Sequence, residues 1–297
     1  MLATTFKNLQ GKHRVIKNYE PPGDNLDKKT VESFGEEWSS FHDFSEQDIT
    51  RAGDMYFDIV STDMMNTQSE VIDIGCGSGR FIRYLKGRCK KIVGVDPSAA
   101  IFAADVVVGP EDSVELIQAS TDNLPYPDNH FDFGYSLGVL HHIPDTQKAL
   151  TDCIKKIKPG GYFLLYLYYS LDNRSWLFNA LFHLSNVIRR IVSKFPARLK
   201  RLTCDILAIV LYMPFVLLRR FLKAIGLPEK FRRSIPLVAY ESQSFYIIRN
   251  DSLDRFGTPL EQRFSRKEIE AMMQEAGLTN IIFSEKIPYW HAVGQKK

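Results

Sequence analysis

The sequence predicts an α/β fold: a doubly wound parallel sheet that ends in an antiparallel hairpin and carries a helical insertion after its fifth strand. Two observations predict it. Short apolar segments alternate with helical segments, which is typical of a parallel sheet covered by helices on both faces. After residue 169 this alternation stops, and it resumes at residue 264. The five apolar segments lie at 71–74, 92–95, 113–118, 131–137 and 162–168.

The composition indicates a folded protein of a reducing compartment. The 297 residues are 44% apolar, 25% charged and 12% aromatic, which excludes disordered, collagen-like and fibrous classes. The formal net charge of +3 is too small to indicate nucleic-acid binding by itself. Cys76, Cys89, Cys153 and Cys204 form no CxxC pair, so we expect neither a zinc site nor a disulfide framework. The first residues lack the apolar run of a signal peptide, and we expect a cytoplasmic protein.

Four segments are expected along the chain. They are an N-terminal arm with a helical flap, the core of the sheet, a basic and apolar helical insertion, and the last helix with the closing hairpin. Their ranges are 1–65, 66–169, 170–263 and 264–297. We expect a polar, loosely held arm and a flap that is helical from about Thr30 to Asp63, whose Trp38 and Phe41 would cover a ligand bound to the core. Ser265 and Glu268 have the spacing of a capping box, which predicts the start of the last helix.

The insertion concentrates both positive charge and apolar residues. Residues 174–233 hold thirteen Lys and Arg against two acids, a net charge of +11, so the rest of the chain carries −8. Apolar spacing predicts helices at 177–191 and 199–224. The uncharged run 206–218 is shorter than the roughly 20 residues that span a bilayer and contains Pro214. The sequence therefore predicts no transmembrane helix.

Three roles are open for the insertion. It could be a lid that docks on the core or self-associates into a homodimer. It could be a patch for an anionic membrane surface, which would make the protein peripheral to the membrane, because Arg189-Arg190, Lys200-Arg201 and Arg219-Arg220 flank its apolar stripes. The third role, contact with nucleic acid, is favoured least because interleaved exposed aromatic residues are few.

A glycine-rich loop follows the first predicted strand and opens a helix. Its sequence, DIGCGSG, lets the backbone approach a ligand closely, whereas a plain tight turn is the alternative. A dinucleotide loop would place its third glycine at position 80, which is Arg80. Asp73 would repel a pyrophosphate and suits a cation such as an α-amino group or a sulfonium. Asp96 ends the second strand, where a carboxylate can accept both hydroxyls of an adenosine ribose.

Five motifs stand in a fixed order between residues 71 and 163: VIDIGCGSGR, VGVDPS, NLPYPDNHFD, SLGVLHHIPD and KPGGYF. In this order they resemble the class I S-adenosylmethionine-dependent methyltransferases, and most of all the type 11 small-molecule group. The resemblance covers about residues 66–168. It implies a Rossmann-like fold, S-adenosyl-L-methionine as cofactor, and methyl transfer by in-line displacement to a small-molecule acceptor. If the insertion is a membrane patch, we expect an amphiphilic or lipid-linked acceptor. A protein that binds the cofactor without methylating, in a regulatory or cofactor-modifying role, and an RNA methyltransferase are the alternatives.

The resemblance also implies cofactor-binding residues. Gly75, Cys76 and Gly77 would line the methionine part of the cofactor, and Asp73 would fix its amino group. Asp96 would hold the ribose.

Further cofactor contacts are implied by the next loops. Pro97 would pack on the adenine. The acid that commonly caps the adenine amino group aligns with Ser120, next to Thr121, so this sequence departs from the family pattern, and Asp122 is a candidate replacement. The main chain at Ser136 and Leu137 would face the methionyl end.

The candidate catalytic residues are His141 and His142, which follow the fourth strand at the substrate rim. Histidine suits proton transfer near neutral pH, and a scaffold role is the alternative. Tyr168 and Tyr169 end the fifth strand and are predicted to line the substrate pocket. Metal-assisted chemistry would need a carboxylate cluster after the fourth strand, where the sequence offers only Asp145, so no metal is expected.

Overall fold

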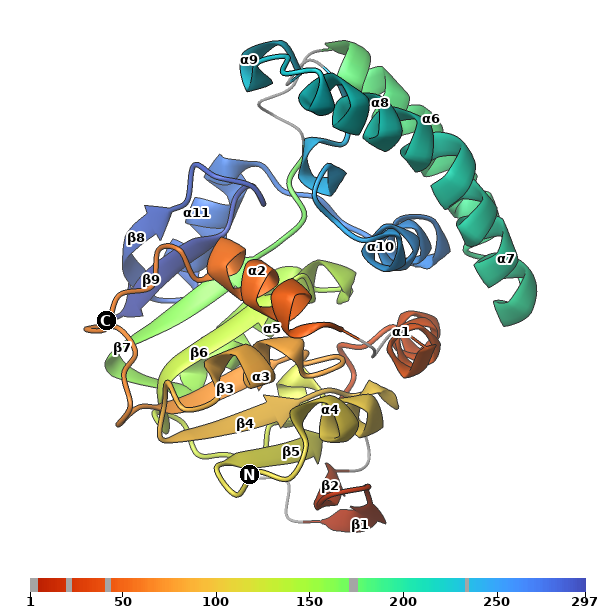
Figure 1. Ribbon diagram of the computed structural model, residues 1–297. Coiled ribbons are helices and arrows are strands. Elements are labelled where there is room, and N and C mark those ends of the chain that lie inside the picture. Colours follow the sequence, from red (N-terminus) through yellow and green to blue (C-terminus); the bar gives the residue numbers. More distant parts are fainter. Residues whose placement is uncertain (1–4, 20–22, 41–43, 171–175, 233–234) are drawn as a thin grey trace. The chain divides into compact units, whose positions relative to one another are not determined.

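A computed structural model of the chain describes residues 5–19, 23–40, 44–170, 176–232 and 235–297 (Figure 1). The chain divides into two compact units. Unit 1 comprises Met1–Asn173 and Leu260–Lys297, and unit 2 comprises Arg174–Pro259. The sheet belongs to unit 1, and helices build unit 2.

A sheet of nine strands, counted over the described residues, forms the centre of unit 1. Its order is β1-β2-β5-β4-β3-β6-β7-β9-β8. The strands β5, β4, β3, β6 and β7 run parallel, and β9 and β8 continue the sheet antiparallel beyond β7. This confirms the predicted Rossmann-like doubly wound sheet with a C-terminal antiparallel hairpin. The bounds are β1 (Phe6–Gln10), β2 (Val15–Tyr19), β3 (Glu70–Ile74), β4 (Lys91–Val95), β5 (Val114–Gln118), β6 (Phe131–Leu137), β7 (Ile157–Tyr166), β8 (Leu278–Phe283) and β9 (Ala292–Lys296).

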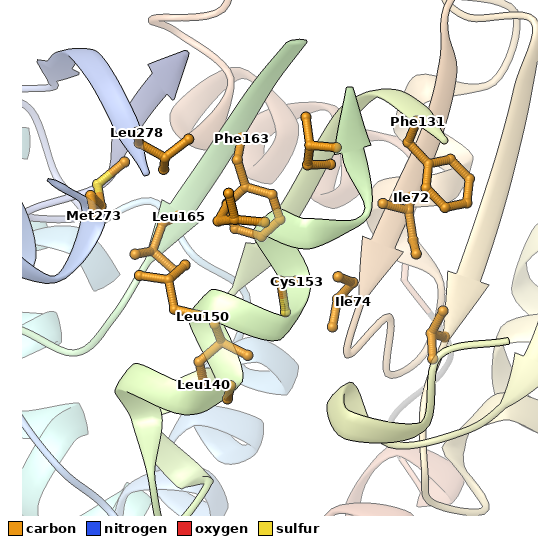
Figure 2. Close-up of a cluster of buried hydrophobic side chains, with 14 of the residues drawn as sticks. Ile72, Ile74, Phe131, Leu140, Leu150, Cys153, Phe163, Leu165, Met273 and Leu278 are labelled. Carbon is orange, nitrogen blue, oxygen red and sulfur yellow. The ribbon is translucent and has the colours of Figure 1, made fainter. Parts of the chain in front are cut away.

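Helices cover both faces of this sheet. Successive residues of a strand point to opposite faces, so the apolar residues of β3 serve two cores. Val71 packs in the core under α3 and α4, with Ile101. Ile72 packs in the other core with Leu150 and Met273, under α5 and α11 (Figure 2). The helix bounds are α3 (Arg80–Leu85), α4 (Ala100–Val108), α5 (Thr146–Lys155) and α11 (Arg266–Glu275). The predicted capping box of Ser265 and Glu268 starts α11.

The N-terminal arm is more ordered than the sequence predicted. β1 and β2 form an antiparallel hairpin, and β2 pairs in parallel with β5. Ile16 is fully buried, which stabilises this edge by about 1.5–3 kcal/mol. Arg14 Nε lies 3.0 Å from Oδ1 of the buried Asp105 of α4. The prediction of a loose arm was wrong because the partner charge is about ninety positions away in the sequence and no local pattern reveals it.

The predicted flap helix is divided in two. α1 spans Lys28–Ser40 and α2 spans Glu46–Tyr56. Ser45 is the N-cap of α2, where its side chain accepts a hydrogen bond from the Asp48 N–H, so a new helix starts there. Phe41, which was predicted near the cofactor, lies outside the described residues.

Unit 2 is built around one long helix. α7 (Ala197–Leu207), a π-helical turn (Ala208–Tyr212) and α8 (Met213–Ala224) are continuous over 28 residues. A helix was predicted over 199–224, and Pro214 does not interrupt it. Proline normally clashes with the carbonyl four residues earlier, and here the wider π turn covers that position. The other helices are α6 (Trp176–Val192), α9 (Glu229–Arg232) and α10 (Phe245–Gly257).

Candidate active site

The loops after the five parallel strands meet at one edge of the sheet. In the hydrogen-bonded register, Ile74 of β3 pairs with Val95 of β4, and Val95 pairs with Ile117 of β5. On the other side Leu137 of β6 pairs with Tyr166 of β7. The carboxyl ends of parallel strands are where open α/β sheets bind ligands. The glycine loop, Asp96, Ser120 and the histidine turn therefore lie along this edge.

The glycine loop requires glycine for two reasons: its backbone adopts positive φ angles, and its packing leaves no room for a side chain. Gly75 and Gly77 have positive φ angles of 81° and 52°. The N–H groups of Gly75 and Cys76 both donate to the carbonyl of Val95, at 2.8 and 2.9 Å, which ties the loop to β4. A Cβ atom at Gly75 would lie 2.4 Å from a methyl of Val139. The loop is therefore a tightly packed cradle that admits no side chain at this position.

Two buried carboxyl groups face this loop. Asp73 is 2% exposed, and its burial raises the pKa of the carboxyl well above its usual range, with the Tyr135 hydroxyl acting in the opposite direction. Oδ2 of Asp73 has no well-formed hydrogen bond within the described residues. Such a group is stabilised as a carboxylate only when a cation or further donors reach it.

Asp96 binds the glycine loop directly. Its Oδ2 accepts the N–H of Gly77 at 2.9 Å, and its Oδ1 accepts the N–H and hydroxyl of Ser98 at 2.8 and 2.6 Å. Burial raises the pKa of Asp96, and these hydrogen bonds oppose the rise. A carboxylate offers about four acceptor positions, so three donors leave room for a ligand hydroxyl. Pro97, next in the chain, is half-buried, and its carbonyl accepts from Gln118 at 3.2 Å.

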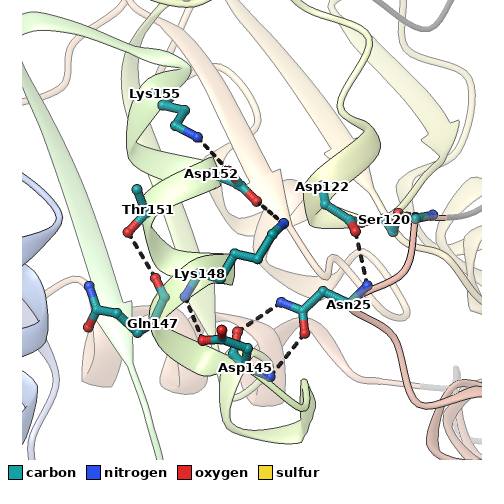
Figure 3. Close-up of polar contacts among 10 residues, drawn as sticks. Asn25, Ser120, Asp122, Asp145, Gln147, Lys148, Thr151, Asp152 and Lys155 are labelled. Carbon is teal, nitrogen blue, oxygen red and sulfur yellow. Dashed lines mark hydrogen bonds and ion pairs between the residues drawn. The ribbon is translucent and has the colours of Figure 1, made fainter.

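Ser120 is occupied by contacts from the N-terminal segment. Its hydroxyl accepts the N–H of Gly23 at 3.0 Å and donates to Oδ1 of Asp122 at 2.7 Å. Asp122 Oδ2 accepts the N–H of Asn25 at 3.0 Å (Figure 3). Burial alone would raise the pKa of Asp122, but these hydrogen bonds outweigh it and lower the pKa. Thr121 is buried in the short 3₁₀ turn that follows Ser120.

Helix α1 lies across this edge of unit 1. Gly35 packs on the loop after Asp96, since a Cβ there would lie 3.3 Å from the Ala99 nitrogen. The Trp38 indole lies over Gly77, with Nε1 3.3 Å from the position of a Gly77 Cβ, and the Arg80 guanidinium stacks 5.3 Å from the Trp38 ring. The glycine loop is thus covered by an aromatic side chain from the N-terminal segment.

The end of β6 braces the loop from the other side. The Ser136 hydroxyl donates to the carbonyl of Ile74 at 2.8 Å, and Ser136 is fully buried. Leu137 is half-buried and packs with the core under α3 and α4. The side chains of both residues therefore serve the scaffold, which leaves their main chain at the edge.

The two histidines pack against each other in a buried turn after β6, with their ring planes tilted by 47°. His141 is fully buried, and neither of its ring nitrogens has a hydrogen-bond partner within the described residues. Burial, followed by the charges of His142 and Arg263, lowers the pKa of His141 well below its usual value, so the ring is neutral at pH 7. His142 Nδ1 lies 2.6 Å from the carbonyl of Leu260, which fixes its tautomer, and its ring packs edge-on against Phe34 of α1 at 4.8 Å.

Tyr168 and Tyr169 point to different surroundings. The Tyr168 ring lies 4.0 Å from the His141 ring and 5.1 Å from the Arg263 guanidinium. The Tyr169 ring packs instead against Tyr289 at 5.7 Å, beside the core under α5 and α11. Tyr168 therefore joins the histidine turn, while Tyr169 does not.

Three residues of this edge were not singled out from the sequence. Asn25, Phe34 and Arg263 reach the edge from segments outside the five motifs. The N–H of Asn25 bonds a residue 97 positions away, and its side-chain amide bonds the carbonyl of Asp145, 120 positions away (Figure 3). No local pattern carries such contacts, although the Pro-Pro-Gly break before Asp24 indicates that the chain turns there.

Comparison with known proteins agrees with this geometry. Residues 72–165 match the model of a methyltransferase domain, of the type 11 group. This segment belongs to a methyltransferase domain of the class I S-adenosylmethionine-dependent family. The matched segment runs from β3 to β7 and so contains the glycine loop, Asp96 and the histidine turn.

The similar curated proteins act on different acceptors. A tRNA U34 carboxymethyltransferase of Pseudoalteromonas atlantica is 34% identical over 99 residues, 32% of this chain and 30% of that protein. Phosphoethanolamine N-methyltransferase 1 of Arabidopsis thaliana is 35% identical over 32% of this chain and 20% of that protein. A sterol 4-C-methyltransferase of Caenorhabditis elegans is 29% identical over 32% of this chain and 30% of that protein. Each match spans less than a third of the relative's length.

Proposed function

We propose that this protein transfers the methyl group of S-adenosyl-L-methionine to a small-molecule acceptor. The observation that carries the proposal is the buried Asp73 carboxyl beside a glycine cradle. A dinucleotide pyrophosphate would be repelled there, whereas an ammonium or sulfonium group would supply the missing counter-charge. The donor, when bound, supplies an electrophilic methyl group.

The residues that would hold the donor follow from the same edge. Asp73 would accept hydrogen bonds from the amino group, and the backbone at Gly75, Cys76 and Gly77 would line the methionine part. Asp96 would use its remaining acceptor position for a ribose hydroxyl. Burial, together with the neighbouring carboxyl groups of Asp73 and Asp96, raises the pKa of the Cys76 thiol well above its usual value, so Cys76 packs in the site as a neutral group.

The adenine end would differ from the family pattern. Pro97, Thr121 and the Ser120–Asp122 pair would border the adenine. Ser120 and Asp122 already accept hydrogen bonds from the N–H groups of Gly23 and Asn25. Since Asp122 is already an acceptor for two donors, it is proposed to orient Ser120 rather than to replace the missing acid.

The acceptor would enter beside His141 and Tyr168. Both rings are packed, and His141 is a neutral, weak base, so the site favours alignment over strong base catalysis. The Arg263 guanidinium next to Tyr168 lies 2.9 Å from the Glu261 carboxylate, so its charge is already balanced by this buried acid. His142 is proposed to be a positioning residue, because its ring holds the Leu260 carbonyl.

The proposed location is the cytoplasm. All four cysteines lie among the described residues and are free thiols, which fits a reducing compartment. A homodimer stays a prediction.

Two experiments test the proposal. Calorimetry with S-adenosylmethionine, S-adenosylhomocysteine and NAD is expected to show binding of the first two alone. A labelled-methyl assay on cell extract, with Asp73→Asn as the control, is expected to label an acceptor in the low-molecular-weight fraction. Binding of NAD without the sulfonium donor would refute the donor site, and labelled RNA would refute the acceptor class.

A further inference from the structure

The long helix of unit 2 has two apolar sides. Its inward side is a stripe spaced by four residues, in which Cys204, Ala208, Tyr212 and Val216 are buried against α10. The outer side of a surface helix is normally polar. Here it is not: Leu202, Ile206, Ile209, Val210, Leu217 and Phe221 are each more than half exposed.

The neighbouring helices of unit 2 show the same outward character. Leu184, Val187 and Ile191 of α6 and Phe231 of α9 are also more than half exposed. Sixteen of the twenty-one large apolar side chains that are exposed in the described part of the chain belong to unit 2, which is less than a third of the residues. Single exposed apolar residues need no explanation, but such a concentration marks an interaction surface.

The cations of unit 2 serve two purposes. Arg189 donates to the carbonyls of Thr258 and Pro259 at 3.0 and 2.9 Å, and Arg219, 1% exposed, lies 2.8 Å from Glu241. Arg220 donates to the carbonyls of Glu241 and Gln243. Of the three predicted flanking pairs, Arg189, Arg219 and Arg220 are therefore used for the packing of unit 2, whereas Arg190 and Arg201 are exposed.

A second group of cations faces solvent. Arg190, Lys194, Arg198 and Arg201 are exposed around the junction of α6 and α7. Lys223, which also lies 3.6 Å from Glu241, and Lys230 are exposed near the end of α8. Cations thus remain at both ends of the outer side of the long helix.

We propose that the outer face of unit 2 docks on an anionic lipid bilayer, with helix Ala197–Ala224 lying in the plane of the interface. The apolar side chains would enter the boundary of the acyl chains, and the exposed cations would reach the lipid phosphates. The net charge of +11 over residues 174–233 favours an anionic surface. The same charge opposes a second copy of this chain, since two such faces would repel each other.

A helix that spans the bilayer is the main alternative. Over the described residues, Ala197–Ala224 is the one helix long and apolar enough to cross a membrane, with a mean hydropathy of 1.9 in its most apolar window, of which 22% is buried. The sequence predicted no transmembrane helix because only the uncharged run 206–218 was counted, whereas the helix that contains this run is 28 residues long. By length and composition alone, spanning and lying flat are equally open.

The inward side of the helix favours the flat orientation. Arg249 of α10 bonds both oxygens of Asp205 at 2.8 and 2.7 Å, and the Ser252 hydroxyl donates to the carbonyl of Cys204 at 2.7 Å. A span would carry these polar groups of α10 into hydrocarbon or break their bonds. Lying flat keeps α10 on the aqueous side. If the proposed function holds, docking on a bilayer also favours an amphiphilic acceptor for the methyl group.

Vesicle co-sedimentation of the full chain tests the docking. The probes are vesicles of phosphatidylcholine alone and of phosphatidylcholine mixed with phosphatidylglycerol, at about 0.1 M and 1 M salt, between which the Debye length falls from about 10 to 3 Å. We expect binding to the anionic vesicles that drops at least tenfold in high salt or with neutral vesicles. No preference for anionic vesicles would overturn the proposal.

Matched variants locate the surface. Leu202→Ser/Ile209→Ser/Phe221→Ser is expected to abolish sedimentation, whereas a control in unit 1, Phe6→Ser/Val106→Ser/Ile282→Ser, replaces side chains that are 41–45% exposed and should bind like the parent. Circular dichroism and donor calorimetry show that each variant is folded. Equal binding by the first variant would overturn the proposal.

Two further measurements test the alternatives to interfacial docking, which are a membrane-spanning helix and a second copy of this chain. Protein that stays in the membrane fraction after alkaline carbonate washing would indicate a span. A dimer in light scattering that the unit 2 variant converts to a monomer, without vesicle binding by the parent, would indicate self-association. Either result would overturn the interfacial proposal, and neither reads methyl transfer, so the donor site is tested separately.

Discussion

Replacing Gly75 by alanine should reveal how tightly the glycine loop is packed. Gly75 and Gly87 have similar positive φ angles, 81° and 75°. A Cβ at Gly87 has no heavy atom within 4 Å, whereas a Cβ at Gly75 would lie 2.4 and 2.5 Å from the two methyls of Val139. Gly87→Ala therefore isolates the cost of the left-handed conformation, about 1–2 kcal/mol, and Gly75→Ala adds the overlap.

The magnitude of the overlap can be stated from general experience with overpacked sites. Forcing extra volume into a packed position costs about 1–3 kcal/mol. We expect Gly75→Ala to lower the free energy of unfolding by about 2–5 kcal/mol and Gly87→Ala by about 1–2 kcal/mol. Urea denaturation followed by circular dichroism and tryptophan fluorescence measures both, and calorimetry with S-adenosylmethionine reports the loss of donor binding.

A double-mutant cycle assigns the extra cost to Val139. Val139→Ala removes both colliding methyls, so the coupling between Gly75→Ala and Val139→Ala should be favourable by about 1–3 kcal/mol. No coupling between Gly87→Ala and Val139→Ala is expected. If Gly75→Ala costs no more than Gly87→Ala, or if the cycle shows no coupling, the packing of the loop against Val139 is refuted.

Three further predictions concern titratable groups. Asp73→Asn should weaken S-adenosylmethionine binding roughly 10–100-fold. Binding of the cation lowers the raised pKa of Asp73, so calorimetry in buffers of different ionisation enthalpy should show proton release on binding to the parent and not to the variant. Equal proton release by the parent and the variant would contradict this role of Asp73. His141→Phe should keep the thermal stability and the donor affinity of the parent. Because burial lowers the pKa of His141, the turnover of the parent should not fall between pH 7 and pH 6 through protonation of a histidine. A fall in that range that His141→Phe removes would show that His141 acts as the catalytic base. Asp58 accepts hydrogen bonds from His291 and Ser284 at 2.7 and 3.0 Å, and these bonds with Lys286 outweigh burial and lower the pKa of Asp58. Asp58→Asn should therefore lower the free energy of unfolding by about 1–3 kcal/mol at pH 7, and by less as the pH falls below about 4, where the parent carboxylate is protonated and loses this contribution. A pH-independent difference in urea titrations would refute the role of the ionised carboxylate.

Much of the cofactor edge could be predicted from local pattern. The strand before the glycine loop, the acid after the next strand and the histidine turn are each encoded within a few residues, because strand periodicity and loop glycines are local requirements. A parallel sheet then brings the carboxyl ends of these strands to one edge, whatever the intervening helices contain. The capping box of Ser265 and Glu268 was predictable for the same reason.

The contacts that cover the edge could not be predicted in this way. Asn25 bonds the loop with Asp122, Trp38 lies over Gly77, and Arg263 faces Tyr168, and each pair joins segments from different parts of the chain. Likewise, the sequence showed that residues 189–220 are basic, but only the fold decides that Arg189 and Arg219 turn inward to bond carbonyls.

The chain's sequence by itself determined the strand and helix alternation, the glycine loop and the charge of the insertion, since these depend on residue types and short spacings. Tertiary structure decided which groups are buried and therefore which carry a shifted pKa, because desolvation depends on what packs around a side chain. It also decided that the long helix of unit 2 keeps an apolar side toward solvent, since one stripe of that helix is satisfied by α10 and the opposite stripe has no cover within the described residues.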